Sequence, residues 1–389
     1  MNDVQVVWNY PTRMLVGAGA AKSLVPKLCE ELSIQSPLVV TDPGLMALPA
    51  MQNLLESWRQ TGLRMGVFAD VKGNPTGENV DAGARQCREN HHDGVIALGG
   101  GSAMDAAKAI ALIAGQHRPL WDFEDEGDNW TRANTEAMLP AIALPTTAGT
   151  GSEVGRASVI TNVQAQRKVI IFHPDMLPER VVLDADLTLG LPATLTAATG
   201  MDALSHNLEA FCAVAYHPMA EGIALEGMRL IHRYLPQVCR DGSDREARQQ
   251  MLVASAMGAT AFQRGLGAMH ALSHTLGALY DAHHGLLNAI VMPYVLQANR
   301  PVIGARMERL ARYLDLPDTG FDGVLDWILA LRREIGIPHT LAEIGIDTAD
   351  ASRVAGMALK DPAAGGNPIA LGREDYEALF VRAVQGSGC

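Results

Sequence analysis

The sequence has few cysteines, no excess of positive charge and no long uncharged apolar run. Its five cysteines among 389 residues lie far apart and form no Cys-x-x-Cys pair, which argues against a disulfide scaffold and a thiolate metal site. Acidic residues outnumber basic ones by 43 to 31, and the net charge of −12 repels nucleic-acid phosphates and anionic membrane surfaces. The first residues, MNDVQVVWNYPT, lack the basic and apolar regions of a signal peptide. We therefore expect a cytoplasmic protein that binds neither nucleic acid nor a membrane.

Hydrophobic residues make up 48 % of the chain, enough for a large core, and the length suggests two domains. From about residue 36 to 186, β-branched runs alternate with helical stretches, as in parallel strands joined by crossover helices. After that point, Ala/Leu/Met-rich segments with helical periodicity continue to the end. The pattern predicts an α/β domain over 1–186, an all-helical domain over 187–385 and an added linker, GSGC, over 386–389.

Local patterns predict individual elements of the first domain. Apolar or β-branched runs predict strands over residues 37–41, 65–71, 94–98, 141–144, 158–161, 169–172 and 181–183. Apolar residues at helical spacing predict helices over 45–61, 77–91 and 103–115. The acidic stretch 121–130, WDFEDEGDNW, is expected to be a surface loop.

Two glycine-rich loops follow predicted strands. The first, GGGS at 99–102, exposes backbone amides at the start of a helix, where a phosphate can bind. It is not the G-x-G-x-x-G fingerprint, because Met104 takes the third glycine position, and alone it fits a structural turn equally well. The second, PTTAGTGSE at 145–153, offers several hydroxyl groups. Together the loops predict a long, doubly phosphorylated ligand at the carboxyl ends of parallel strands.

Asp42 ends the first strong strand pattern, PLVVTD. A carboxylate there can accept both hydroxyl groups of an adenosine ribose and repel a 2′-phosphate. The structural alternative is that Asp42 caps the helix that follows.

Histidines cluster in the helical half. Asp202 and His206 are four residues apart, which places them on one helix face, and His270 and His274 are spaced likewise before the pair at 283–284. From the residues alone, a metal site and a structural cluster remain equally open. Imidazoles with a carboxylate and no thiolate suit ferrous iron, zinc, nickel or cobalt. The remaining histidines that show no partner spacing, and are expected to be structural, are at 91, 92, 117, 173, 217, 232 and 339.

These motifs resemble the iron-containing (group III) alcohol dehydrogenases, a superfamily that also holds glycerol dehydrogenase and, more distantly, dehydroquinate synthase. The resemblance covers the chain apart from GSGC. It is carried by VTD, NPT at 74–76, GGGSAMDAAKAIA, PTTAGTGSEV, DADLTLGLP, GMDALSHNLEAF, LGAMHALSHTLGALYDAHHG and DPAAGGNP at 361–368. It implies a dehydroquinate synthase-like fold, with a Rossmann-like dinucleotide-binding α/β domain, an all-α C-terminal domain, and a cleft for cofactor and metal. A homodimer or larger assembly is also implied.

The resemblance assigns roles to individual residues. The implied metal ligands are Asp202, His206, His270 and His284. His274 matches a histidine near the substrate that does not bind metal; we expect a proton relay there, with simple packing as the alternative. The implied positions around the nicotinamide cofactor are Asp42, Asn74, Gly100, Gly101, Ser102, Thr146, Thr147 and Lys168. Aspartate at the first of these favours NAD over NADP.

The implied activity is metal-dependent NAD(H) alcohol dehydrogenation. A short alcohol or diol and its aldehyde or ketone would be interconverted by hydride transfer, with ferrous iron, or alternatively zinc, as the Lewis acid. Few charged residues occur between 255 and 285, which suits a dry pocket for an uncharged substrate. Departures from the family pattern at Gly155, 261–267 and Ala363 leave the substrate open.

Other activities are compatible with the motifs. A dehydroquinate synthase-like enzyme would need several basic residues for an anionic substrate, and the metal-binding segments offer only Arg264. A glycerol dehydrogenase-like metal and NAD enzyme is a further alternative. In a non-catalytic metal-binding protein, the histidines would only crosslink helices, although cysteines more often close such sites.

Overall fold

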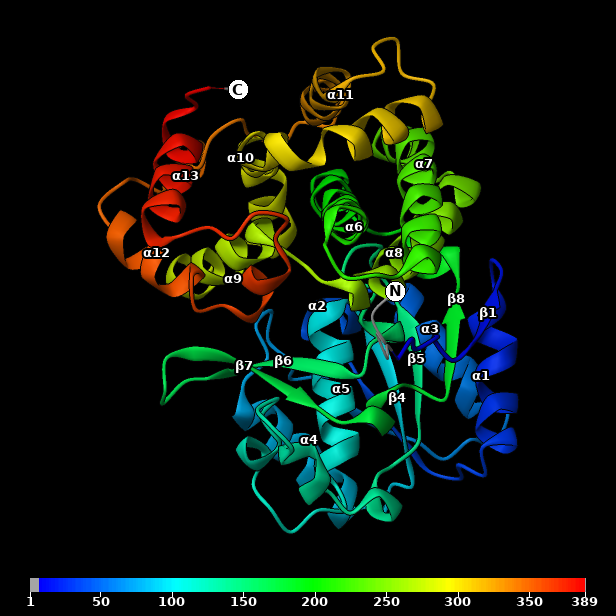
Figure 1. Cartoon of the computed structure of the whole chain (residues 1–389). Coiled ribbons are helices and arrows are strands. Elements are labelled where there is room, and N and C mark those ends of the chain that lie inside the picture. Colours follow the sequence, from blue (N-terminus) through cyan, green and yellow to red (C-terminus); the bar gives the residue numbers. More distant parts are fainter. Residues whose placement is uncertain (1–6, 389) are drawn as a thin grey trace. The chain divides into compact units, whose positions relative to one another are not determined.

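The computed structural model describes residues 7–388, which form two compact units (Figure 1). An α/β unit spans Pro11–Gly190, and a helical unit comprises the chain from Leu191 onwards together with residues 7–10. The sequence had placed that boundary at residue 186 and the first residues in the α/β domain. Residues 7–10 belong with the helices because the Trp8 ring stacks on His217, with centroids 4.5 Å apart. Residues 1–6 and Cys389 of the expected linker lie outside the described residues.

A sheet of six parallel strands, in the order β1-β8-β5-β4-β2-β3, forms the centre of the α/β unit. The strands are β1 (Arg13–Val16), β2 (Pro37–Val40), β3 (Gly66–Phe68), β4 (Gly94–Gly99), β5 (Ala141–Pro145) and β8 (Arg180–Leu183). The predicted Rossmann-like parallel sheet is confirmed. Only β1 was not predicted, because this exposed strand starts with an arginine and lacks a buried apolar run.

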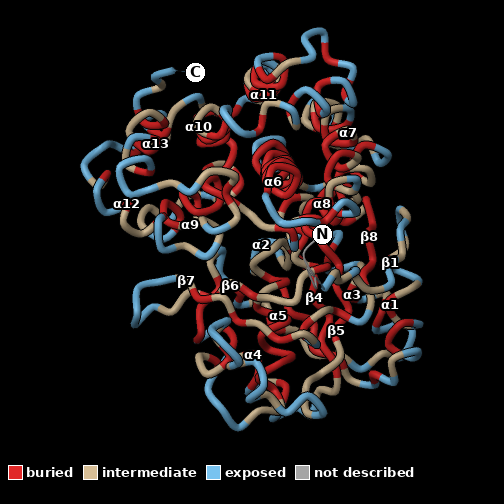
Figure 2. Tube along the Cα trace, in the orientation of Figure 1, coloured by how far each residue is buried: buried red, intermediate tan, exposed pale blue. Residues whose placement is uncertain are grey.

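Helices cover both faces of the sheet. Val39, Ile96 and Ile142 face α1 (Ala20–Glu31) and α3 (Pro49–Arg59) in one buried cluster. The opposite face carries α4 (Gly77–Glu89) and α5 (Gly101–Ile113), and Gly83 of α4 lies against both Phe68 of β3 and Ile110 of α5. Because both faces are covered, the central strands are apolar throughout (Figure 2).

The strands predicted at 158–161 and 169–172 do not join the parallel sheet. They form a separate antiparallel hairpin of β6 (Ala157–Asn162) and β7 (Arg167–Phe172). The expectation of a parallel arrangement was wrong because only residues 163–166 separate the two strands, and a parallel crossover needs about a dozen residues.

The single helix predicted over 45–61 is divided into α2 (Pro43–Met46) and α3. The division falls before Pro49, where Leu48 is extended with φ −82° and ψ 125°. A residue that precedes proline avoids the helical region, because the proline ring clashes with it. The acidic stretch 121–130, expected to be a surface loop, contains short 3-10 turns, at Leu120–Phe123 and from Asn129, and an antiparallel β-bridge between Glu124 and Ile171 of β7.

The helical unit is arranged around α6 (Ala193–Cys212), which is buried over most of its length (Figure 2). Its other helices are α7 (Pro218–Arg240), α8 (Arg245–Ala261), α9 (Ala268–Tyr280), α10 (His284–Tyr313), α11 (Phe321–Glu334), α12 (Ala351–Ala358) and α13 (Arg373–Gln385). The predicted all-α domain is confirmed. Among the described helices, none combines the length and apolar character that a bilayer crossing requires.

A buried lysine ties α5 to the chain before the hairpin. Lys108 is 2 % exposed, and its Nζ donates to the backbone carbonyls of Ser152, Gly155 and Ala157. Its ammonium group also lies 3.4 Å from the Asp105 carboxylate, which in turn accepts the Ser152 hydroxyl. Burial lowers the Lys108 pKa, and the Asp105 charge opposes that effect. The second glycine loop is therefore anchored to the helix that follows the first.

We expect Lys108→Met to destabilise the protein by about 2–4 kcal/mol, because it leaves buried carbonyl groups and a carboxylate without their cation. Urea unfolding followed by circular dichroism measures the change. The matched control is Lys22→Met on the exposed side of α1, which should change the unfolding free energy by less than about 0.5 kcal/mol. Equal effects of the two substitutions would contradict the anchoring role.

Candidate active site

Four side chains from three helices of the helical unit converge. Asp202 and His206 come from α6, His270 from α9 and His284 from the start of α10, and one potential ligand atom from each lies within 4.8 Å of the others. Three of these residues are buried, and His284 is half-buried. The structure thus brings together all four residues that the resemblance had assigned to a metal.

Close contact between α10 and α6 makes this convergence possible. A Cβ on Gly285 would lie 2.4 Å from the Ala198 carbonyl oxygen and 2.9 Å from Asp202 Cβ. Only glycine allows the first turn of α10 to reach α6 so closely. As a result His284 Nε2 lies 3.5 Å from Asp202 Oδ1.

Glu209, one turn after His206 on α6, fixes the orientation of His270. Its Oε2 lies 2.7 Å from His270 Nδ1, and the carboxylate also accepts the backbone N–H groups of Gly267 and Met269. Burial raises the pKa of Glu209 to about 7, while these hydrogen bonds oppose the shift. Burial also lowers the pKa of His270, so its imidazole stays neutral. With Nδ1 donating to Glu209, His270 Nε2 carries the free lone pair.

His284 has the same tautomer for a different reason. Ser273 Oγ donates to the His270 carbonyl oxygen at 3.2 Å and lies 3.3 Å from His284 Nδ1. With the serine proton assigned to the His270 carbonyl oxygen, His284 Nδ1–H donates to Oγ, and Nε2 is left with a lone pair. Two imidazole nitrogens and a carboxylate therefore face one another as acceptors.

His274 lies beside this group but does not belong to it. Its ring stacks on His284 with centroids 5.2 Å apart, and its Nδ1 lies 3.0 Å from Asp361 Oδ2. The other Asp361 oxygen accepts the Ala363 N–H and so caps a short 3-10 turn, Pro362–Gly366. A carboxylate held in this way fixes His274 Nδ1–H as donor and leaves Nε2 as acceptor.

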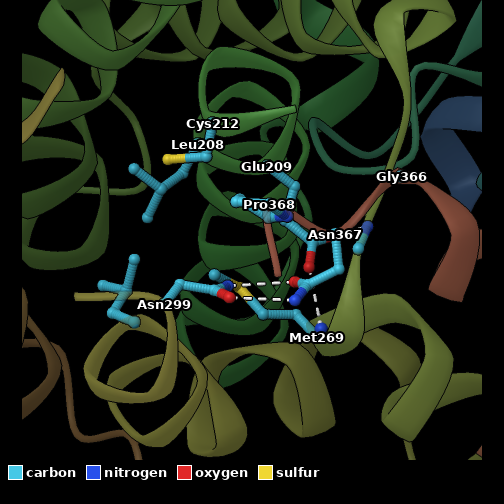
Figure 3. A pocket seen from close by; sticks show the side chains of 10 residues that line it. Leu208, Glu209, Cys212, Met269, Asn299, Gly366, Asn367 and Pro368 are labelled. Carbon is cyan, nitrogen blue, oxygen red and sulfur yellow. Dashed lines mark hydrogen bonds between the residues drawn. The ribbon is translucent and has the colours of Figure 1, made fainter. Parts of the chain in front are cut away.

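A small cavity lies behind Glu209 (Figure 3). It measures about 10 Å³, room for roughly one water molecule, and is bordered by Cys212, Met269 and the amides of Asn299 and Asn367. The two amides bond to each other at 2.8 and 2.9 Å, and Asn367 also accepts the Ala268 N–H. This amide pair joins the segment before α13 to the start of α9 and thereby supports the helix that carries His270.

The two glycine loops of the α/β unit lie against each other. A Cβ on Gly100 would lie 3.2 Å from Thr147 Oγ1, and one on Gly101 would lie 2.6 Å from Thr150 Cγ2. The Thr146 N–H donates to the Gly99 carbonyl oxygen at 2.9 Å. The loops are thus adjacent at the carboxyl ends of β4 and β5, as the sequence predicted for one shared ligand.

Other residues assigned to the cofactor lie near these loops or pair with one another. Ser102 Oγ donates to the Gly73 carbonyl oxygen at 2.5 Å, next to Asn74. Lys168 Nζ donates to Asn74 Oδ1 at 2.9 Å, which joins β7 to the NPT motif. Asp42 Oδ1 accepts the Leu45 N–H at 3.0 Å, so the capping interpretation of this residue is realised. A Cβ on Gly99 would lie 3.6 Å from Asp42 Oδ2, so the second carboxylate oxygen is directed towards the first glycine loop.

Arg264 stabilises the carboxyl end of α6. Its guanidinium donates to the carbonyl oxygens of Ala210, Phe211 and Ala215 and lies 2.8 Å from Glu221. The side chain is buried. Arg264 is therefore committed to a helix end and to an ion pair, and is not free for an anionic substrate.

Sequence reasoning did not single out three residues that contact the four potential metal ligands or His274. They are Glu209, Asn288 and Asp361. Two of them follow a helical pattern that could have indicated them. Glu209 lies three residues after His206 and Asn288 four after His284, which places each on the same face of its helix. Asp361 follows no such pattern, since its partner His274 lies on another element.

Comparisons with known proteins match both halves of the chain. The family described as "Iron-containing alcohol dehydrogenase" matches residues 11–185, and "Fe-containing alcohol dehydrogenase family, C-terminal" matches 196–384. A 4-hydroxybutyrate dehydrogenase from Cupriavidus necator is 40 % identical over 384 residues, which cover 96 % of this chain and 99 % of the relative.

Solved structures agree with this result. A crystal structure of a 1,3-propanediol oxidoreductase superposes with a TM-score of 0.92 at 33 % identity, covering 97 % of this chain and 100 % of the other. A sulfoacetaldehyde reductase from Bifidobacterium kashiwanohense, in complex with NAD+, gives a TM-score of 0.89 at 29 % identity, covering 99 % and 100 %. The chain therefore belongs to the iron-containing alcohol dehydrogenase family and is an alcohol oxidoreductase.

Proposed function

We propose that this enzyme is a metal-dependent NAD(H) alcohol dehydrogenase that interconverts a short alcohol or diol and its aldehyde or ketone by hydride transfer. The observation that carries the proposal is the convergence of Asp202, His206, His270 and His284, with their potential ligand atoms within 4.8 Å of one another. We assign these four residues as the ligands of one divalent ion.

The donor set fits such an ion. Three imidazoles and one carboxylate without a thiolate suit ferrous iron, with zinc as the alternative. Glu209 and Ser273 hold His270 and His284 in the tautomers that present a lone pair to a cation. A bound divalent ion supplies Lewis acidity, which lowers the pKa of an alcohol hydroxyl group and polarises a carbonyl group.

We assign the proton transfer to His274. Oxidation of an alcohol releases a proton that must reach solvent, and the His274 side chain is 24 % exposed while stacking on His284. Asp361 holds Nδ1–H, so Nε2 is the atom that takes the proton. Asp361 also stabilises the imidazolium that results.

We place the nicotinamide cofactor, NAD, on the two glycine loops of the α/β unit. Backbone amides after Gly100 and the hydroxyl groups of the second loop suit its phosphates. The proposed cofactor residues are Asp42, Asn74, Gly100, Gly101, Ser102, Thr146, Thr147 and Lys168. The Asp42 carboxylate would accept the ribose hydroxyl groups and exclude a 2′-phosphate.

The alternatives are less well supported. A cyclase-like reaction on a multiply charged substrate would need free basic side chains, and Arg264 is engaged by carbonyl oxygens and Glu221. A purely structural metal site would leave the paired glycine loops and the His274–Asp361 pair without a role. Net formation of NADH from a simple alcohol would separate the proposed reaction from both.

Two named relatives narrow the substrate class. One is a 4-hydroxybutyrate dehydrogenase and another a 1,3-propanediol oxidoreductase. Both names denote short chains that end in a hydroxyl group. We therefore propose a short terminal alcohol as substrate, with a hydroxy acid as the second candidate. A kinetic panel of ethanol, 1,3-propanediol and 4-hydroxybutyrate with NAD and NADP, on iron-loaded and zinc-loaded protein, tests this proposal.

We also propose a cytoplasmic location and a homodimer or larger assembly. The free cysteines at 29, 87, 212 and 239 suit a reducing compartment. Sedimentation of the purified protein would measure the assembly.

His284→Ala should remove one ligand and weaken metal binding by at least about 100-fold, with a comparable loss of turnover. Metal analysis after dialysis and steady-state kinetics measure the two effects. The matched control is His283→Ala, the neighbouring residue, which caps α10 through the Leu286 N–H. Full metal content and normal turnover in His284→Ala would show that the ligand assignment is wrong.

Asp42→Asn should raise the ratio of NADP to NAD activity by about tenfold or more, because the charge that repels the 2′-phosphate is removed. Asparagine can still cap α2, so this variant separates the two roles of the residue. Asp42→Gly, which lacks a capping side chain, should relax cofactor choice similarly. An unchanged ratio of kcat/KM values in both variants would leave Asp42 as a helix cap only.

His274→Ala should keep its metal and bind NADH normally while turnover falls by about 10²–10⁴-fold. Because the variant lacks the proton acceptor, the lower limb of the pH–rate profile for alcohol oxidation should disappear in it. Stoichiometric loss of metal would instead make His274 a ligand, and unchanged kinetics would reduce it to packing.

A further inference from the structure

Asn288 lies on α10 one turn after His284, and its side chain is fully buried. Its Nδ2 atom is 2.9 Å from Asp202 Oδ1. The same atom is 3.2 Å from both His270 Nε2 and His284 Nε2. One amide group thus contacts three of the four side chains that we assign to the metal.

The chemistry of these partners identifies the amide nitrogen as the contacting atom. Asp202 Oδ1 can only accept when ionised, and both imidazole Nε2 atoms carry lone pairs because their Nδ1–H groups are engaged by Glu209 and Ser273. An amide oxygen in this position would face three acceptors. Asn288 Oδ1 points elsewhere, is buried, and has no hydrogen-bond partner among residues 7–388. The amide therefore leaves its oxygen unpaired in favour of the contacts that its nitrogen makes.

These contacts compete with a metal ion. The single lone pair of an imidazole Nε2 can accept an N–H or bind a cation, but it cannot do both. A carboxylate oxygen has further lone pairs, so the contact with Asp202 can persist when an ion binds. Metal binding through His270 and His284 must therefore break the two imidazole contacts and can spare the third.

We propose that Asn288 is a displaceable donor that holds Asp202, His270 and His284 together before the metal enters and releases the two imidazoles when it binds. It is a positioning residue and not a ligand. The proposal rests on the proposed metal centre. Its consequence is that Asn288 weakens metal binding, because part of the binding free energy is used to break its hydrogen bonds.

Removal of the donor should destabilise the metal-free protein more than the metal-loaded protein. Without the amide, Asp202, His270 and His284 lose the hydrogen-bond donor that they share, whereas in the loaded state the ion replaces it. By thermodynamic linkage, Asn288→Leu should then bind the ion more tightly, with a Kd about tenfold lower than that of the parent.

The experiment is a Zn²⁺ titration of chelator-stripped protein in competition with a chromophoric chelator. It uses the full chain and needs no activity. The control is Gln297→Leu on the same helix, which removes a side-chain amide bonded to Arg382 and should leave the Kd within about twofold of the parent. Asn288→Ala, which is smaller, serves if the leucine side chain prevents folding. Thermal unfolding with and without Zn²⁺ provides the second readout. The rise in melting temperature on metal addition should be larger in both Asn288 variants than in the parent.

A lower Kd together with a larger metal-induced rise in melting temperature supports the proposal. A higher Kd in Asn288→Leu and Asn288→Ala would overturn it by making Asn288 a ligand. An unchanged Kd would overturn it by reducing the amide to packing. If the parent itself binds no Zn²⁺, the proposed metal centre fails, and that result is distinguished from the others before any variant is made.

Discussion

The structure of the helical unit depends on bringing several lone-pair acceptors together inside a protein. Asp202, His270 and His284 repel one another unless a positive charge or a hydrogen-bond donor lies among them. Different surrounding residues satisfy this constraint in different ways. Glu209 and Ser273 turn the imidazoles so that their lone pairs face inward, and Asn288 supplies a donor. Gly285 allows the backbones to approach closely enough for these contacts to form.

The α/β unit contains the reverse arrangement, in which a buried cation is surrounded by acceptors. The Lys108 ammonium is surrounded by backbone carbonyl oxygens from the end of the second glycine loop and from the chain just after it, and by the Asp105 carboxylate. This arrangement fixes a loop that has little regular secondary structure of its own. The glycines at 100 and 101 then bring the two loops into contact. The charge of Lys108 in the middle of α5 thus fixes the second glycine loop, which lies against the first.

Sequence reasoning predicted what depends on local periodicity. The central strands of the sheet and the i, i+4 spacing of Asp202 with His206 follow from residues close in the chain. The layout of β6 and β7 could also have been predicted, because the connection over 163–166 is too short for a crossover. The contact of Glu209 with His270 joins two helices, and no spacing in the sequence indicates it. Asp42 shows a further limit, since one carboxylate can cap a helix and still present its second oxygen to a ligand.

The grouping of residues 7–10 with the helices has a topological consequence. The α/β unit is an insertion within the helical unit, and the chain passes between the two at residues 10–11 and again at 190–191. During synthesis the whole α/β unit leaves the ribosome before the helices that complete the Trp8 contact exist. The inserted unit can fold early, whereas the helical unit must pack against an N-terminal segment, residues 7–10, that was synthesised long before. A fragment that starts at residue 191 would therefore lack the aromatic ring that stacks on His217.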